Sequence, residues 1–328
     1  RQTAAGADHL KGVIGQMDAR FKGRDFLTLM DFSTEEITTF VDTAAEFKRL
    51  RSMGVQHDYL RGRTVAMIFE KKSTRTRTSF QAACSHLGMD SFYLRPDEMQ
   101  LGRGEPIKDT ARIIDRYCDA LVIRTYGQKI VEEFAQYMRN PVINALTDEF
   151  HPCQGLADLL TIREKKGRLK GLKVAYAGDI WNVAHTWLVI AGKMGINLHM
   201  VYPKGYDPRP DVVESARRDA KLNGSEIVLS NNLKESAKDC DVIIANTWHS
   251  MGGPEQTKEQ RLKDWAPFQV TNDIMKLAKE DAIFMHCMPA YRGEEVTEEV
   301  IDGAQSVIID EGENRMHTEK AVLALVIS

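Results

Sequence analysis

Short apolar runs alternate with longer amphipathic stretches almost throughout this chain. Residues 64–69 form a β-branched, apolar run bounded by charged residues, which is typical of a buried strand. The stretch that follows places Phe80, Ala83 and Leu87 at helical spacing. Alternation of this kind predicts a parallel sheet whose strands are joined by crossover helices.

The same reading predicts the elements of both halves. Strands are expected at 64–69, 91–94, 120–123, 142–145, 173–177, 198–202, 227–229, 242–245, 283–286 and 306–309. Helices are expected near 74–88, 107–117, 129–138, 156–165, 183–193, 210–222, 271–279 and 313–327. Ser33 and Glu36 form a capping-box pattern that opens one further helix.

A chain of 328 residues is long for a single core, so two domains are expected. The predicted fold class is α/β, with each domain a mainly parallel sheet flanked by helices. We expect the domains at 1–150 and 151–312, joined by bridging helices, with a helix at about 313–328 packing back on the first domain. Residues 1–20 fit an N-terminal extension better than a remnant transit peptide, because Asp8 and Asp18 count against the latter.

Composition indicates which binding partners and which cellular compartment to expect. A net charge of −3 gives no reason to expect a nucleic acid or an anionic membrane as partner, and no apolar run reaches the roughly 20 residues of a membrane helix. Five cysteines without a CxxC pair favour reduced thiols in a cytoplasmic compartment. The missing CxxC pair also argues against a zinc site, Gly178-Asp179 lacks the other glycines of a dinucleotide fingerprint, and there is no Walker A sequence, so no metal or organic cofactor is predicted.

Residues 73–80 read Ser-Thr-Arg-Thr-Arg-Thr-Ser-Phe, at a predicted junction between a strand and a helix. Unpaired N–H groups and the helix dipole favour an anion there, and a guanidinium can bind phosphate bidentately. Arg75 and Arg77 are two residues apart, so on a helix at most one of them faces the anion. A solvated helix start is the more frequent fate of such a block taken alone.

Four further residues carry candidate chemistry. His151 and Gln154 are three apart and would face one side of a first helical turn, where they could polarise a carbonyl group or simply cap the helix. Arg124 follows a predicted strand and could bind substrate or form a surface ion pair. Cys287 follows His286 on a strand, so the two side chains point to opposite faces, and a buried structural thiol is the plainer interpretation.

Several separated motifs give this chain a family resemblance. The block Ser73–Thr76 is followed, in order, by Gln100-Leu101-Gly102, His151-Pro152-Cys153-Gln154, Ser250-Met251-Gly252, His286-Cys287-Met288-Pro289-Ala290 and Glu313-Asn314-Arg315. With these motifs the chain resembles the aspartate/ornithine transcarbamylase family, and within it the ornithine carbamoyltransferases. The resemblance runs from about Phe21 to near the C-terminus.

The resemblance implies transfer of the carbamoyl group of carbamoyl phosphate to the δ-amine of L-ornithine, giving L-citrulline and phosphate. It implies a first domain that binds carbamoyl phosphate and a second that binds ornithine, with no covalent intermediate. It also implies a homotrimer, in which Gln100 enters the site of the adjacent subunit. The implied catalytic residues are Arg124, His151, Gln154 and Cys287.

The implied binding residues form two sets. Those for carbamoyl phosphate are Ser73, Thr74, Arg75, Thr76, Gln100, Arg124, His151, Gln154, Cys287, Met288 and Arg315. Those for ornithine are Asn182, Asn246, Ser250, Met251, Cys287 and Met288.

Asn246 departs from the family pattern, which has an aspartate four residues before the serine. A carboxylate would pair with the α-ammonium group of ornithine, whereas an amide offers only a dipole. Trp181 also replaces a smaller polar residue. The alternatives are therefore a carbamoyltransferase for another amine, such as putrescine or an N-acylated ornithine, and a non-catalytic relative.

Overall fold

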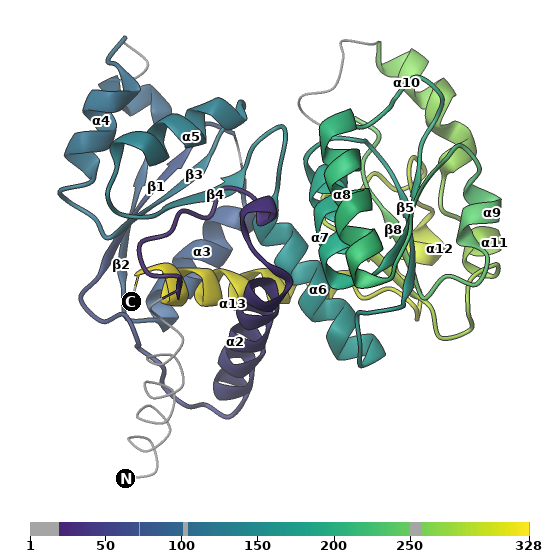
Figure 1. Cartoon of the computed structure of the whole chain (residues 1–328), viewed down its shortest axis with the longest axis horizontal. Helices are drawn as coiled ribbons and strands as arrows, with labels where there is room; N and C mark the ends of the chain where they lie inside the picture. The colour runs from purple at the N-terminus through teal and green to yellow at the C-terminus, as the bar shows by residue number, and fades with distance from the viewer. Residues whose placement is uncertain (1–19, 72, 101–103, 250–256, 328) are drawn as a thin grey trace. The chain divides into compact units, whose positions relative to one another are not determined.

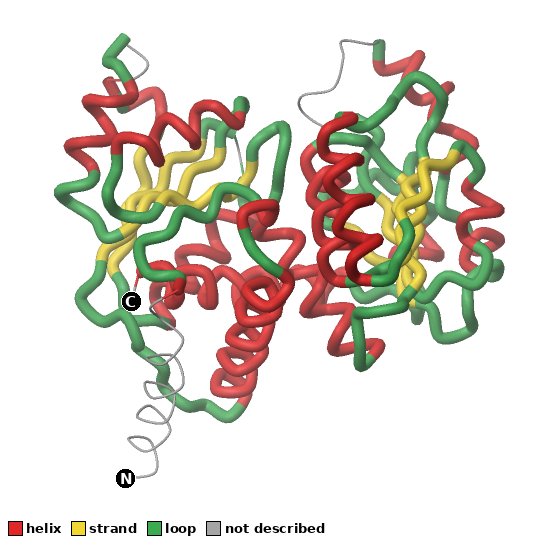
Figure 2. Tube along the Cα trace, viewed as in Figure 1, coloured by secondary structure: helices red, strands yellow, loops and turns green. Residues whose placement is uncertain are grey.

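The computed structural model describes residues 20–71, 73–100, 104–249 and 257–327, in two compact units. Unit 1 comprises residues 1–157 and 313–328, and unit 2 comprises residues 158–312. Each unit holds one sheet in which every strand pairing is parallel (Figures 1 and 2). This confirms the predicted α/β fold class. Within the described residues, no helix is long and apolar enough to cross a bilayer.

The sheet of unit 1 has four strands in the order β2-β1-β3-β4. Their bounds are β1 Thr64–Phe69, β2 Asp90–Leu94, β3 Ala120–Arg124 and β4 Val142–Leu146, each within one residue of the sequence prediction. β1 is central and buried from Val65 to Phe69, which explains its continuous apolar run. Its partner β3 ends at Arg124, so the carboxyl edge of the sheet carries that side chain.

Helices cover both faces of this sheet (Figure 1). On one face lie α4 (Ile107–Ile114) and α5 (Gln128–Tyr137), whose residues Ala111, Val131 and Phe134 pack with those of β1 and β3 in one apolar cluster. On the other face lie α2 (Thr34–Ser52), α3 (Arg75–His86) and α13 (Ile308–Ile327). The capping box predicted at the start of α2 is confirmed, because Ser33 and Glu36 bond each other's main-chain N–H groups.

The sheet of unit 2 has five strands in the order β7-β6-β5-β8-β9. Their bounds are β5 Lys173–Ala177, β6 Asn197–Val201, β7 Ile227–Ser230, β8 Val242–Ala245 and β9 Ile283–His286. From β5, the chain first adds β6 and β7 on one side and then adds β8 and β9 on the other side, so the strand order reverses next to β5. In open parallel sheets, ligands bind beyond the carboxyl ends of strands at such a reversal. Asn246 and Cys287 directly follow β8 and β9 at that edge.

The helices of unit 2 also lie on both sides of its sheet (Figure 1). α7 (Asn182–Met194) and α8 (Pro210–Asn223) pack against each other on one side. On the other side lie α9 (Leu233–Ala237), α11 (Asn272–Met275) and α12 (Glu298–Ile301). A further helix, α10, spans Lys258–Trp265. The helix predicted near 271–279 is thus real but shorter than expected.

Two helices contain the boundaries between the units. α6 (Pro152–Lys166) begins in unit 1 and continues past residue 157 into unit 2. α13 begins at Ile308 in unit 2 and continues past residue 312 into unit 1. The strand predicted at 306–309 is therefore wrong: Ser306 makes a single bridge to Phe284, and the helix starts two residues later. Its apolar run Val307-Ile308-Ile309 has no period that separates a strand from a helix start.

Candidate functional site

The Ser73–Thr76 block forms the start of α3, as the sequence predicts. The Ser73 hydroxyl accepts a hydrogen bond of 3.2 Å from the Thr76 N–H, so it caps the first turn. Arg75 is the first residue of α3 and is exposed. Arg77 instead lies with its guanidinium 3.9 Å from the centre of the Tyr93 ring. The two arginines therefore have separate surroundings. Of the two, Arg75 is the one at the N-terminus of α3, where an anion is favoured.

Thr76 is the centre of a cluster that joins three distant parts of the chain. Its hydroxyl lies 3.2 Å from Nη1 of Arg124 and 3.2 Å from Nη2 of Arg315. Nη1 of Arg315 donates to Oε1 of Gln154 at 2.8 Å. All four residues belong to unit 1, and the structure brings them together as the sequence motifs imply. Two guanidinium groups converging on one hydroxyl create a strongly positive region beside the start of α3.

His151 completes this cluster as a neutral base. Burial, reinforced by the charges of Arg315 and Arg124, holds the pKa of its imidazole well below the usual range. The residue is 4 % exposed and directly precedes α6, which carries Gln154 one turn further on. A neutral imidazole beside two cations can donate one hydrogen bond without adding a third positive charge.

Glu319 is a member of this cluster that the sequence reading missed. It lies one turn beyond Arg315 on α13, with its Oε1 3.1 Å from Nη2 of that arginine, and it is fully buried. Burial raises the pKa of the Glu319 carboxyl to about 7, against the opposing effects of Arg315 and the Ser79 hydroxyl. An acidic residue four positions after a functional arginine on one helix was the available signal.

In unit 2, Asn246 is part of a chain of hydrogen bonds that also includes Cys287, Tyr176 and Asp179. Its Nδ2 donates to the Tyr176 hydroxyl at 3.0 Å, while its Oδ1 accepts from the Thr247 N–H at 2.9 Å and from the Cys287 thiol at 3.3 Å. The Tyr176 hydroxyl in turn donates to the Asp179 carbonyl at 3.0 Å. The amide of Asn246 therefore uses both its donor and its acceptor, which an aspartate could not do.

His286 and Cys287 have different partners, as the alternation along a strand predicts. Nε2 of His286 lies 2.9 Å from the buried Glu295 carboxylate, and its Nδ1 accepts from the Met288 N–H at 2.8 Å. The Cys287 thiol faces Asn246 instead. Met288 has a φ of 57°, which turns the chain sharply after the strand.

The other residues predicted for the site are Asn182, Gln100, Thr74, Ser250 and Met251. Asn182 is buried at the start of α7, with its Oδ1 accepting from the Val183 N–H at 2.7 Å. Gln100 is exposed and follows the short helix η3 (Pro96–Glu98). Thr74 precedes α3 and is exposed. Ser250 and Met251 lie outside the described residues.

The fold and the cluster together define a two-unit α/β protein whose first unit places two arginines beside a helix N-terminus, an arrangement suited to a small oxyanion. Two family models match the chain. The carbamoyl-P binding domain of aspartate/ornithine carbamoyltransferase matches residues 24–164, and the Asp/Orn binding domain of the same enzymes matches residues 170–326. The chain belongs to the aspartate/ornithine carbamoyltransferase family.

Individual relatives are similar over almost the whole chain. An ornithine carbamoyltransferase of Caldicellulosiruptor saccharolyticus is 52% identical over 92% of this chain and 98% of its own length. A solved ornithine carbamoyltransferase from Pyrococcus furiosus superposes with a TM-score of 0.90 at 49% identity, covering 93% of this chain and 97% of that one. An anabolic ornithine carbamoyltransferase from Campylobacter jejuni gives a TM-score of 0.86 at 42% identity, covering 92% and 97%.

Proposed function

We propose that this protein is an ornithine carbamoyltransferase, which transfers the carbamoyl group of carbamoyl phosphate to the δ-amine of L-ornithine and releases L-citrulline and phosphate. One observation carries the proposal: relatives at about half identity over nearly their full length have this activity in their names. The arginine cluster around Thr76 gives the proposal a physical basis, because the reaction needs a dianionic phosphate to be held.

Unit 1 supplies the groups that carbamoyl phosphate needs. Ser73, Thr74, Arg75 and Thr76 would bind the phosphate at the start of α3, where the helix dipole and free N–H groups favour an anion. Arg124 and Arg315 would reach the phosphate and the carbonyl oxygen from the other side of Thr76. Their charges would neutralise the phosphate as it leaves.

His151 and Gln154 would act on the carbamoyl group itself. Because its pKa is lowered by burial and by two arginines, His151 is neutral at pH 7 and can donate to the carbonyl oxygen as negative charge develops there. Oε1 of Gln154 accepts from Arg315, and the Gln154 amide would contact the carbamoyl nitrogen. Arg315 thus holds the amide in the orientation that this contact requires.

Unit 2 supplies the candidate groups for the amino acid. Asn182, Asn246, Ser250 and Met251 would hold the α-amino acid end of ornithine. Because the Met288 N–H already donates to His286, we assign the contacts near the δ-amine to the main-chain carbonyl groups of Cys287 and Met288. The partly exposed Cys287 thiol donates to Oδ1 of Asn246, and this contact supports a positioning role for Cys287.

The proposal includes a cytoplasmic homotrimer. All five cysteines are free and four are buried, which suits a reducing compartment. Gln100 is exposed, as a residue that serves a neighbouring subunit must be in the single chain. Carbamoyl phosphate, ornithine and two further copies of this chain are therefore the proposed partners.

A parallel assay tests the function. Purified protein is offered carbamoyl phosphate with ornithine, putrescine or N-acetylornithine, and the carbamoylated product is measured in each case. We expect citrulline to form at a kcat/KM at least about 100-fold above that of the other amines, because only ornithine fits both ends of the site. Preference for another amine would assign Asn246 to that specificity, and no product from any amine would indicate a non-catalytic relative.

A further inference from the structure

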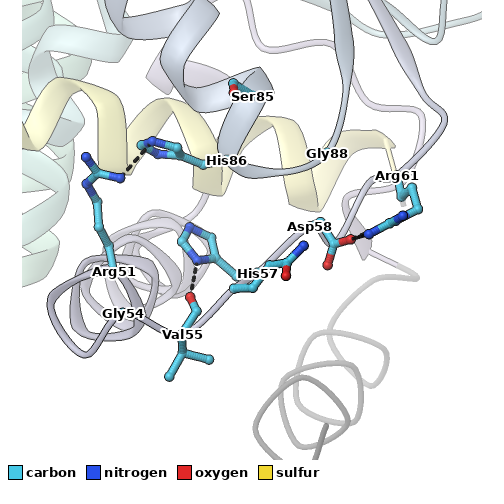
Figure 3. A pocket seen from close by; sticks show the side chains of 10 residues that line it. Arg51, Gly54, Val55, His57, Asp58, Arg61, Ser85, His86 and Gly88 are labelled. Carbon is cyan, nitrogen blue, oxygen red and sulfur yellow. Dashed lines mark hydrogen bonds and ion pairs between the residues drawn. The ribbon is translucent and has the colours of Figure 1, made fainter. Parts of the chain in front are cut away.

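Unit 1 has a pocket that lies away from the Thr76 cluster. It has a volume of about 520 Å³ and opens between the C-terminal ends of α2 and α3 (Figure 3). Its lining residues are Arg51, Gly54, Val55, Gln56, His57, Asp58, Arg61, Ser85, His86 and Gly88. α3 starts at Arg75 beside the cluster and ends at His86 beside this pocket, so about 16 Å of helix separates the two.

The walls of this pocket are held in place by main-chain bonds. The Leu60 N–H donates to the Leu87 carbonyl at 2.8 Å, and the Gly62 N–H donates to the Gly88 carbonyl at 3.3 Å. Gly88 has a φ of +74°, and a Cβ atom there would lie 2.9 Å from the Cβ of Asp58. The loop and the end of α3 therefore approach each other as closely as a glycine permits, which makes the pocket preformed.

Two cations are held here by two imidazoles. Nη1 of Arg51 lies 2.7 Å from Nε2 of His86 (Figure 3), and Nζ of Lys320 lies 3.0 Å from Nε2 of His57. Nδ1 of His57 bonds the Val55 carbonyl at 2.9 Å, so it carries the hydrogen and Nε2 is the acceptor. Since arginine can only donate, Nε2 of His86 is also an acceptor. Both imidazoles therefore accept at Nε2 and are neutral in this arrangement, and Arg51 keeps its charge where it lines the pocket.

Positive charge is in excess around this pocket. Asp58 is the single carboxylate among the lining residues, and it already pairs with Arg61. Within the described chain, no carboxylate forms an ion pair with Arg51 or Lys320. The nearest balancing charge on α13 is Glu313, which bonds His317 at 3.2 Å.

The titration of these groups reflects their mutual repulsion. Burial, together with Arg51, Lys320 and His57, lowers the pKa of His86 to about 4. Burial and Arg51 lower the pKa of Lys320 to about 7, against the opposing charge of Glu313. Burial, with Lys320, Lys48, Arg51 and His86, likewise lowers the pKa of His317 to about 3. The groups that lower these pKa values come from α2, α3 and α13, and Arg51, His57 and His86 among them line the pocket.

Helix dipoles explain only part of this arrangement. Arg51 and His86 lie in the last turns of α2 and α3, where a positive charge is favoured. Lys320 lies seven residues before the end of α13 and gains no such stabilisation. Burial without a carboxylate partner is the reason that the pKa of Lys320 is lowered.

We propose that this pocket is an anion-binding site, separate from the Thr76 cluster, for a small molecule that carries a phosphate-like dianionic group. Arg51 is exposed at its edge and presents a guanidinium fork, which matches such a group bidentately. The volume is within the range of small-molecule sites. The bound anion supplies the negative charge that the surrounding side chains lack.

Sulfate is a suitable probe because it is tetrahedral, dianionic and does not titrate near neutral pH. The pKa of His86 is measured by NMR of histidine-labelled protein in sodium sulfate and in sodium chloride at equal ionic strength. We expect sulfate to raise this pKa by about one unit or more, since an opposite charge within a few ångströms favours the imidazolium. Acetate at the same ionic strength should have little effect.

Three variants assign the effect to the pocket. Arg51→Gln should abolish the sulfate-dependent rise, whereas Arg124→Gln, which alters the Thr76 cluster, should retain it. Arg116→Gln removes an exposed arginine that does not line the pocket and serves as the matched control. An unchanged His86 pKa in sulfate, a rise that survives Arg51→Gln, or a rise lost in Arg124→Gln would each overturn the proposal.

A diffraction experiment on the unmodified protein tests the site without any variant. Crystals are soaked in selenate, and anomalous scattering locates the selenium. A peak within hydrogen-bond distance of the Arg51 guanidinium supports the proposal. Selenate bound at the Thr76 cluster but missing from this pocket contradicts it.

Discussion

Glu319 is an ionisable group whose charge state changes near neutral pH. Its pKa is about 7 in the folded protein, because burial disfavours the charged form, and near 4.5 when exposed. A raised pKa means that the folded state binds the proton more tightly. The stability contributed by this proton is complete below about pH 4.5 and is lost as the pH rises through 7.

Glu319→Gln should therefore change the pH dependence of stability. At pH 8 the wild type contains a buried, charged carboxylate, and the variant does not. The difference in free energy of unfolding, variant minus wild type, should therefore be larger at pH 8 than at pH 4 by up to about 3 kcal/mol. Chemical denaturation at pH 4, 6 and 8 measures this. Glu133→Gln, on the exposed side of α5, is the control and should show no such trend. A parallel pair of stability curves for Glu319→Gln and wild type would refute the assignment.

Arg75 and Arg77 offer a matched comparison at the phosphate end of α3. Arg75→Lys should lower kcat/KM for carbamoyl phosphate more than 100-fold, or about 3 kcal/mol, because an ammonium group cannot reproduce a bidentate fork. Arg77→Lys should retain most of the activity, since Arg77 stacks on Tyr93. Steady-state kinetics on both variants measures the difference. Equal losses would remove the basis for assigning the phosphate to Arg75.

Asn246→Asp tests the departure from the family pattern. A carboxylate would bind the α-ammonium of ornithine through a charge-assisted bond, so KM for ornithine should fall several-fold while KM for carbamoyl phosphate stays nearly constant. The structure adds a second expectation. Loss of the Nδ2 donor to Tyr176 should lower the free energy of unfolding at pH 7 by about 1–3 kcal/mol. A variant that no longer accepts ornithine would identify Asn246 as selecting another amine.

At the scale of elements, the packing of α7 against α8 depends on one glycine. A Cβ atom at Gly192 would lie 2.5 Å from the Ala216 carbonyl oxygen, so the two helices can approach only without it. Gly192→Ala should lower the free energy of unfolding by about 1–3 kcal/mol. Gly312→Ala, inside α13 with open space around it, should instead raise stability by up to about 1 kcal/mol. Thermal and urea denaturation distinguish the two, and equal effects would contradict this view of the packing.

The elements that the sequence predicts well are those with a single strong signal. β1, β5, β8 and β9 have continuous apolar runs between polar boundaries, and the structure confirms their bounds. The start of α13 was missed because it begins within the apolar run Val307-Ile308-Ile309, whose periodicity does not separate a strand from a helix start. Glu319 was missed for a different reason, since its role depends on burial beside Arg315 and on contacts that only the fold creates.

At the scale of the whole molecule, the proposed trimer makes a prediction about mixed subunits. If Gln100 serves a neighbour, a subunit inactive through Gln100→Ala still has its own Arg124, and a subunit inactive through Arg124→Gln still has its Gln100. Mixing equal amounts after denaturation should restore up to about one quarter of wild-type activity, because half of the sites have an intact Arg124 and half of those meet an intact Gln100. Activity that stays near zero at every mixing ratio would indicate a site built within one chain.

The interrupted path of unit 1 has a consequence for how the protein is made. Residues 158–312 are a continuous stretch, whereas unit 1 needs residues 313–328, which are translated only after all of them. Domains fold as units while the chain emerges from the ribosome. Unit 2 can therefore finish folding first. The cluster of Thr76, Arg124 and Gln154 is completed only when Arg315, on the last helix, has been translated and has folded. If Arg315 binds carbamoyl phosphate as proposed, a chain released before residue 315 is translated cannot form the complete substrate site.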